Sequence, residues 1–222
     1  MVSIQKGGYI HMRSRRVWHR IVVMLMVFAM VFAVVAVRPE CDALAATKTP
    51  VATHGRLSVK GADLVDAKGR KFQLRGVSTH GINWDVGHPY VNKAAFKTLR
   101  DDWGANAVRL AMYTSEYNGY CSGGNKAALR NQIYKGVKYA TDLGMYVIID
   151  WHILNDGNPM TQVAEARKFF ATMAKKYKNQ KNIIYEICNE PNGCNWTTIK
   201  KYAAQVIKVI RKYDKKLSAT SL

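Results

Sequence analysis

The sequence predicts an α/β fold in which parallel strands alternate with helices, as they do in a (β/α)8 TIM barrel. Three observations predict it. Short apolar runs rich in β-branched residues recur along the chain, amphipathic stretches with helical spacing separate them, and polar side chains follow directly after each run. The elements are therefore expected in the order βαβαβαβα.

The first ordered element is expected at residue 56, where short strands at 57–60 and 64–65 lead through a turn at 66–69 to a strand at 71–77. Further strands are expected at 107–112, 145–149 and 183–187, with helices at 92–103, 125–143, 161–177 and 197–213. Gly104 and Gly144 each follow a helical stretch and suit a left-handed helix stop.

Four β/α units are counted in this way, whereas a closed eight-stranded barrel needs about 250 residues. The prediction is a barrel of which only the first four units are present. A doubly wound open sheet is the alternative, but no glycine-rich phosphate loop follows any strand, so the barrel is favoured.

The first 45 residues have the features of a signal peptide. Basic residues precede an apolar run at 21–37, and small residues at 43–46 suit cleavage after Ala45. We therefore expect a secreted, extracellular protein with a short linker at 46–55 and a catalytic half-domain at 56–222. An uncleaved membrane anchor is the alternative, since the run is close to the length of a short spanning helix.

The chain is strongly basic, with a formal net charge of +19. Its lysines are spread over helix faces and no nucleic-acid-binding motif accompanies them, which favours a solvated basic face over binding to nucleic acid or to an acidic cell wall. Cys121, Cys188 and Cys194 follow the signal segment in a pattern that matches no metal site and requires no disulfide, although one bridge would be compatible with it.

In a parallel barrel the chemistry lies at the carboxyl ends of the strands. The residues at these four ends are Ser78, His80, Asn83 and Trp84; Arg109 and Tyr113; Asp150, Trp151 and His152; and Asn189 and Glu190. Together they predict one polar mouth for a flat-faced ligand such as a sugar, whose rings stack on aromatic faces.

The run from Tyr185 to Pro191 resembles the Asn-Glu-Pro signature of glycoside hydrolase family 5, a cellulase-rich family of retaining (β/α)8 enzymes. The runs at 74–81, 108–113 and 147–152 support the resemblance in order. The resemblance implies a retaining endo-β-1,4-glucanase acting on β-glucan such as cellulose, without metal or organic cofactor.

By the same resemblance, Glu190 is the expected proton donor and Asn189 the partner of the sugar 2-hydroxyl. Arg109 and His152 are the expected polar support of the catalytic centre. His80, Trp84 and Tyr113 are the expected contacts to the sugar on the glycone side.

Retaining hydrolysis also needs a nucleophilic carboxylate about 5 Å from the acid, which the family supplies from strand seven. Glu186 is four strand residues from Glu190, roughly 13 Å away, and Glu116 has no counterpart in the family's pair. No nucleophile is therefore expected in this chain, which is expected to be inactive alone. A non-catalytic glycan-binding or cell-surface protein and a gene remnant are alternatives, and open barrel edges predict self-association.

Overall fold

The computed structural model describes residues 48–214, in which four parallel strands alternate with four long helices. The predicted signal peptide lies outside these residues. Among residues 48–214, no helix combines the length and apolar character that a bilayer crossing requires. The elements are α2 (Pro50–His54), β1 (Ser58–Lys60), β2 (Asp63–Val65), β3 (Gly76–Ser78), η1 (His88–Tyr90), α3 (Lys93–Asp101), β4 (Ala107–Tyr113), α4 (Lys126–Asp142), β5 (Tyr146–His152), η2 (Pro159–Gln162), α5 (Val163–Tyr177), β6 (Ile183–Glu186) and α6 (Trp196–Tyr213).

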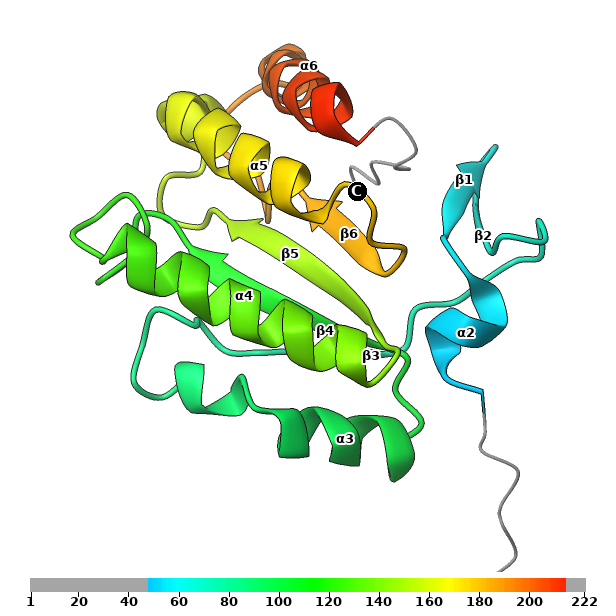
Figure 1. The fold of residues 1–222 in the computed structure, drawn as a ribbon. Coiled ribbons are helices and arrows are strands. Elements are labelled where there is room, and N and C mark those ends of the chain that lie inside the picture. Colours follow the sequence, from blue (N-terminus) through cyan, green and yellow to red (C-terminus); the bar gives the residue numbers. More distant parts are fainter. Residues whose placement is uncertain (1–47, 215–222) are drawn as a thin grey trace, which may run out of the picture. The chain divides into compact units, whose positions relative to one another are not determined.

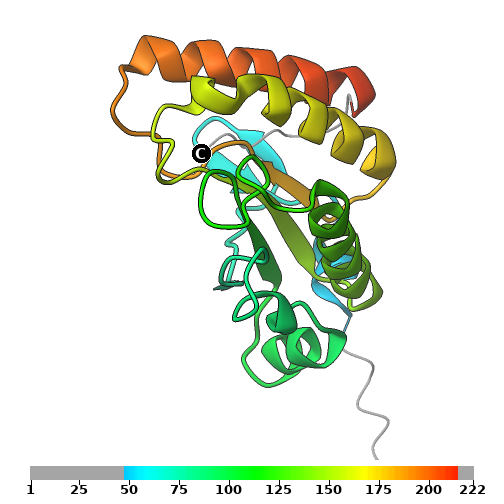
Figure 2. The same ribbon diagram turned by 90° about the vertical axis from the view of Figure 1, so that its left-hand side faces the viewer.

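The sheet has the order β3-β4-β5-β6, with every neighbouring pair parallel. This confirms the four predicted β/α units. The four long helices lie on one side of the sheet (Figures 1 and 2). Within the described residues, β3 and β6 are edge strands with one neighbour each.

Asparagine is the N-cap residue of three of the helices. Asn92, Asn125 and Asn195 cap α3, α4 and α6 by accepting hydrogen bonds from backbone N–H groups in the first turn. The predicted helix stops are confirmed as well, since Gly104 and Gly144 have φ angles of 67° and 64°. Local sequence signals therefore position the helix ends that flank the strands.

The N-terminal region differs from the prediction in two places. The expected strand at 71–77 is reduced to an isolated bridge between Val65 and Lys71 and to the three residues of β3. The segment expected to be a linker at 46–55 contains α2, which the side chain of Thr49 caps. This short helix is anchored by a hydrogen bond from Val51 N to Gly144 O of 2.9 Å.

Side chains on the two faces of the sheet form two separate apolar clusters. The larger one fills the space between sheet and helices, around Leu110, Ile133 and Phe170. The smaller one lies on the inner face near the start of the strands, where Tyr146 and Ile184 pack with Leu57 and Phe72 from the N-terminal region. The inner face is thus apolar at its base, which leaves its other end for the polar residues.

Candidate active site

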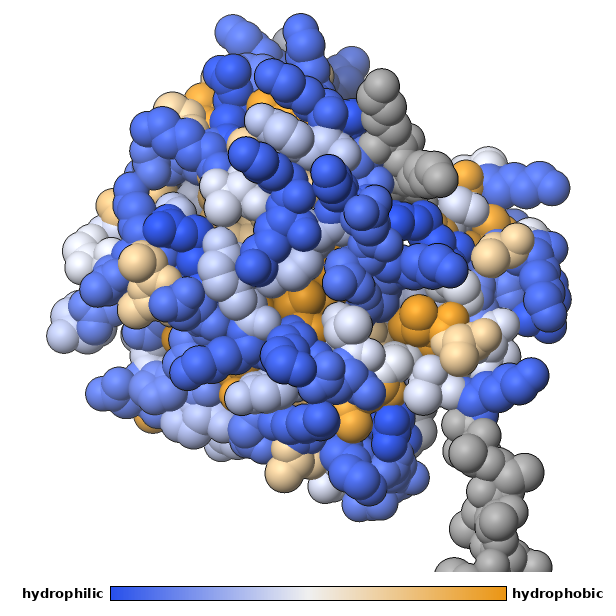
Figure 3. All heavy atoms as spheres, in the orientation of Figure 1, coloured by the Kyte–Doolittle hydropathy of each residue, from blue (hydrophilic) through white to orange (hydrophobic). Residues whose placement is uncertain are grey.

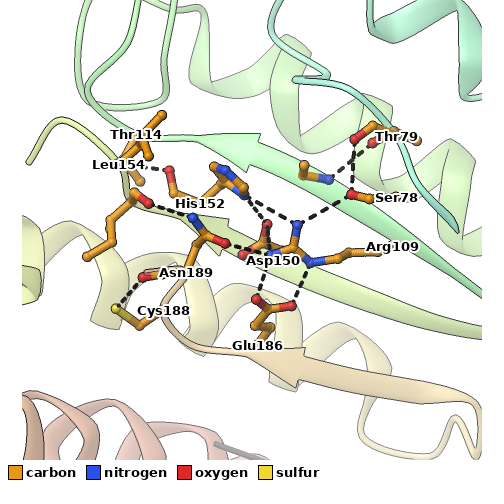
Figure 4. A network of polar contacts seen from close by, with 12 residues as sticks. Ser78, Thr79, Arg109, Thr114, Asp150, His152, Leu154, Glu186, Cys188 and Asn189 are labelled. Carbon is orange, nitrogen blue, oxygen red and sulfur yellow. Dashed lines mark hydrogen bonds and ion pairs between the residues drawn. The ribbon is translucent and has the colours of Figure 1, made fainter. Parts of the chain in front are cut away.

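Arg109 is the centre of a polar network on the inner face of the sheet (Figure 4). It lies on β4, in register with Ser78 on β3. Its Nε donates to Glu186 Oε2 at 2.7 Å and its Nη2 to Glu186 Oε1 at 2.5 Å, which is a bidentate pair. The Nη2 atom also lies 3.0 Å from Asp150 Oδ2. One guanidinium therefore bridges carboxylates on two neighbouring strands.

Three further side chains complete the contacts of this guanidinium. Arg109 Nη2 donates to Asn189 Oδ1 at 3.0 Å, and Nη1 donates to Ser78 Oγ at 3.3 Å. His152 Nδ1 lies 3.5 Å from Nη1. Side chains from β3, β4 and β5 and from the end of β6 therefore converge, as the barrel prediction requires.

Asp150 is a buried carboxylate that orients His152. Its Oδ2 lies 2.6 Å from His152 Nδ1, and an ionised carboxylate at this distance favours the tautomer that carries its proton on Nδ1. Burial raises the pKa of Asp150 to about 6, although the hydrogen bond from His152 opposes the shift. Burial lowers the pKa of Arg109, but the bond to Glu186 and the nearby carboxylates outweigh it, so the pKa is raised and the cation is retained.

The predicted sugar contacts form a continuous row of rings that ends at His152. The ring centroids of His80 and Trp84 are 5.1 Å apart, those of Trp84 and Tyr113 are 4.6 Å apart, and those of Tyr113 and His152 are 4.0 Å apart. The row joins the β3 end of the sheet to the Arg109 network.

Backbone geometry fixes the position of Trp84 in this row. Its Nε1 donates to Tyr117 O at 2.7 Å, and the same carbonyl accepts a bond from Asn83 Nδ2 at 2.9 Å. A Cβ atom at Gly81 would lie only 2.7 Å from the Trp84 ring, so only glycine allows this packing. The loops after β3 and β4 therefore hold the indole between them.

Glu190 lies on the exposed turn that follows β6, next to the firmly held Asn189. Asn189 N donates to Trp151 O at 3.2 Å and its Nδ2 to Ile153 O at 3.0 Å. Burial raises the pKa of Tyr113, and the charges of Glu116, Asp150 and Glu190 act in the same direction. Glu190 is therefore within electrostatic reach of the ring row.

Two residues at the strand ends, Trp151 and Cys188, are buried in the larger apolar cluster. Trp151 points to the helix side, where its fully buried ring packs against Phe169 and Tyr120. It was expected at the mouth, but side chains alternate along a strand, so Asp150 and His152 face inward and Trp151 cannot. Burial raises the pKa of Cys188 to about 12, which disfavours a thiolate there.

The sequence did not reveal which acids pair with Arg109, nor how the loops above the strands are held. Thr114 Oγ1 donates to Asp156 Oδ2 at 2.9 Å, and Asn155 N donates to Glu116 Oε1 at 2.9 Å. These bonds connect the loops after β4 and β5. The one sequence signal that could have pointed to a buried cationic partner is an acid directly within a buried strand, as Glu186 is.

Comparison with known proteins gives the family. The model for cellulase, glycosyl hydrolase family 5, matches residues 65–220. This chain belongs to that family. It is 53% identical to endoglucanase A of Butyrivibrio fibrisolvens over 165 residues, which is 72% of this chain and 38% of that protein. It is 41% identical to endoglucanase E-5 of Thermobifida fusca over 79% of this chain and 37% of that protein.

Solved structures show the same architecture. The catalytic domain of T. fusca endoglucanase Cel5A, crystallised with cellotetraose, matches with a TM-score of 0.70 and 40% identity over 75% of this chain and 53% of that one. A cellulase named Cel5C_n matches with a TM-score of 0.72 and 41% identity over 76% and 54%. The described residues therefore have the fold of part of a family 5 (β/α)8 barrel. The chain spans about half the length of these structures and well under half of the curated relatives.

Proposed function

We propose that this family 5 chain provides the acid/base side of a retaining endo-β-1,4-glucanase that cleaves cellulose or a related β-glucan. The observation that carries the proposal is the ring row from His80 to His152, which ends at the Arg109 network beside Asn189 and Glu190. Aromatic faces suit pyranose rings, and a carboxylic acid at the end of the row suits the bond to be cleaved.

In this proposal Glu190 protonates the oxygen of the leaving sugar. Asn189 holds the sugar 2-hydroxyl, because its amide nitrogen carries a second hydrogen beyond the one donated to Ile153 O. Arg109 fixes Asn189 through a 3.0 Å bond and supplies positive charge near the reacting centre. The rings of Trp84 and Tyr113 hold the glycone side of the chain.

The second carboxylate is expected outside the described residues. The three candidates near the mouth within residues 48–214 are already engaged: Glu186 forms a bidentate pair with Arg109, Asp150 bonds His152, and Glu116 accepts a bond from Asn155 N. An attacking carboxylate must be free to form a covalent bond to the sugar. The 222-residue chain alone is therefore expected to give no turnover.

Export and self-association are part of the proposal. The basic and apolar segment that precedes Ala46 supports secretion, with membrane anchoring as the alternative if it is not cleaved. Among residues 48–214, β3 and β6 are the edge strands of the sheet, and the side chain of Val77 on β3 is exposed, which supports association through the sheet edges.

A fusion protein tests the proposed function. Residues 48–220 are joined to the part of B. fibrisolvens endoglucanase A that follows its matched segment, and release of reducing sugar from soluble β-glucan is measured. We expect activity in the fusion and a loss of about 10²- to 10⁴-fold with Glu190→Gln, because a general acid contributes that much. The matched control is Glu165→Gln on the outer surface of α5, which should leave the rate unchanged.

Two outcomes would contradict the assignment. Equal activity in the fusion and its Glu190→Gln variant would remove Glu190 from the chemistry. Binding of cello-oligosaccharides by the unfused chain, together with a folded fusion that shows no turnover, would favour a non-catalytic glycan-binding protein instead. The intact ring row favours this second candidate, since binding by the rings needs no nucleophile.

A further inference from the structure

The helices of this chain differ in how their lysines are neutralised. On α3 and α4, Lys93 Nζ lies 3.2 Å and Lys138 Nζ 2.9 Å from Asp142 Oδ2, and Lys97 Nζ lies 2.5 Å from Asp101 Oδ2. These cations have acidic partners on the same helix pair. Their field at a distance is therefore largely cancelled.

The helices α5 and α6 carry an excess of positive charge. The acidic residue of α5, Glu165, is occupied by Lys126 and Lys168 at 2.7 and 2.9 Å, and α6 contains no acidic residue. We define the basic face as the exposed basic side chains of 175–181 and of α6, the latter being Lys200, Lys201, Lys208, Arg211 and Lys212. Among the salt bridges of residues 48–214, none involves a member of this face.

The basic face is extended rather than compact. The two helices pack side by side on the outer side of the sheet (Figures 1 and 2), and the 18 residues of α6 span about 27 Å. A hollow of about 590 Å³ beside α6 is lined by Lys208, Arg211 and Lys212 with the smaller Ala204 and Ile207. The surface over these helices is mostly hydrophilic (Figure 3). Its shape suits a long anionic chain better than a single small anion.

We propose that the basic face binds a flexible polymer of phosphodiester repeats outside the cell, as an anionic wall polymer presents. Cations spaced along two neighbouring helices match charges repeated along a flexible chain, and lysine binds phosphate as a point charge without requiring fixed geometry. Binding there leaves the mouth open, because the mouth residues lie at the strand ends on the inner face.

Two other polyanions fit the face less well. A helix that binds a bilayer surface usually presents large apolar side chains beside its lysines. Among the described residues of α5 and α6, the one large hydrophobic side chain that is exposed is Trp196, at the very start of α6. Single-stranded nucleic acid is held by aromatic side chains interleaved with the basic ones, and the basic face has none exposed between Lys200 and Lys212. Charge alone is the recognition that this face offers.

Binding of poly(glycerol phosphate) to the full chain tests the proposal. A helix variant combines Lys175→Gln, Lys178→Gln, Lys200→Gln and Lys208→Gln. A matched control variant, with the same change in net charge, combines Lys60→Gln, Lys68→Gln, Arg75→Gln and Lys135→Gln, all exposed and distant from α5 and α6 along the chain. We expect the helix variant to bind at least about tenfold more weakly with a shallower salt dependence, and the control to bind about as the parent does.

The remaining outcomes each overturn a part of the proposal. Equal loss in both variants would mean that net charge, and not this face, attracts the polymer. No binding by the parent chain at about 0.15 M salt would overturn it altogether. Tighter binding to vesicles of phosphatidylglycerol or to single-stranded DNA, again lost only in the helix variant, would replace the wall polymer by a membrane or a nucleic acid. Circular dichroism of both variants checks that each is folded.

Discussion

The two ends of the inner face of the sheet are built from the same strands but hold together by different forces. At the base, Tyr146 and Ile184 pack with Leu57 and Phe72, and the contacts are apolar. A few residues further along the same strands, Arg109 and Asp150 form a charged network with Glu186. Apolar burial is nearly independent of pH, whereas the charged network depends on the protonation of its acids.

This difference indicates that one end of the inner face, the base, stabilises the fold, and that the other end, the mouth, provides the candidate site. The base is satisfied without any ligand, so it provides a rigid platform for the strands. The mouth contains a buried carboxylate whose Oδ1 atom, in Asp150, has no hydrogen-bond partner within residues 48–214. Such a group costs free energy unless its charge partners are present, and this kind of cost is typical of active sites.

Removing the central cation should have the largest effect. Arg109→Met keeps a side chain of similar length but leaves Asp150 and Glu186 without their shared partner. We expect the free energy of unfolding to fall by about 3 to 5 kcal/mol at neutral pH, the usual result of breaking a buried ion pair from one side. Urea denaturation of the parent and variant measures it.

Arg75→Met is the matched control for this change, since Arg75 is exposed and should contribute less than about 0.5 kcal/mol. A loss below about 1 kcal/mol in Arg109→Met would show that the network contributes little to stability. The mouth would then not be held together by its paired charges, and it would not differ from the base in this respect.

The pH dependence of stability should distinguish the mouth from the base. The pKa of Asp150 is raised from its ordinary value of 3.8 to about 6 in the folded chain. Between these two pH values the folded state therefore binds more protons than the unfolded state. The contribution of Asp150 to stability therefore decreases as pH rises from about 4 to about 6. Between these pH values the deprotonation of Asp150 should lower the free energy of unfolding by an amount on the order of 2 kcal/mol. We expect Asp150→Asn to remove this decrease.

Denaturation of both proteins at several pH values checks this prediction. The substitution Asp150→Asn also changes the 2.6 Å contact of that side chain with His152. The double variant Asp150→Asn with His152→Gln separates the two groups. An unchanged slope in Asp150→Asn would assign the pH dependence to a different residue.

Much of the fold and of the candidate site could be predicted from the sequence, because both depend on local patterns. The apolar runs, the amphipathic stretches and the glycine stops predicted the alternating strands and helices. The residues after each strand gave the ring row, since the carboxyl ends of parallel strands meet at one edge. The pairing of Arg109 with Glu186 could not be predicted, because it depends on the register of strands 77 residues apart in sequence.

Trp151 shows the same limit from the other side. It follows Asp150 directly, and its position at a strand end suggested the mouth, yet it packs among Phe169 and Phe170. A shift of one residue reverses the face of a strand, and the strand end alone does not determine which residue points inward. The roles of Glu190, His80, Trp84 and Tyr113 in sugar chemistry stay predictions that the fusion protein tests.

The smallest effect is expected at the base. Tyr146 lies on β5 in the apolar cluster, and its hydroxyl donates to Gly55 O at 2.6 Å, which ties the segment after α2 to the sheet. Tyr146→Phe keeps the ring and removes only this bond, so the free energy of unfolding should fall by about 1 kcal/mol. Burial raises the pKa of Tyr146 to about 12, so this loss should be the same from pH 4 to pH 8 in urea denaturation. A loss that changed with pH over that range would mean that the base is coupled to the charged mouth, and the two ends of the inner face would then have to be treated as one electrostatic unit.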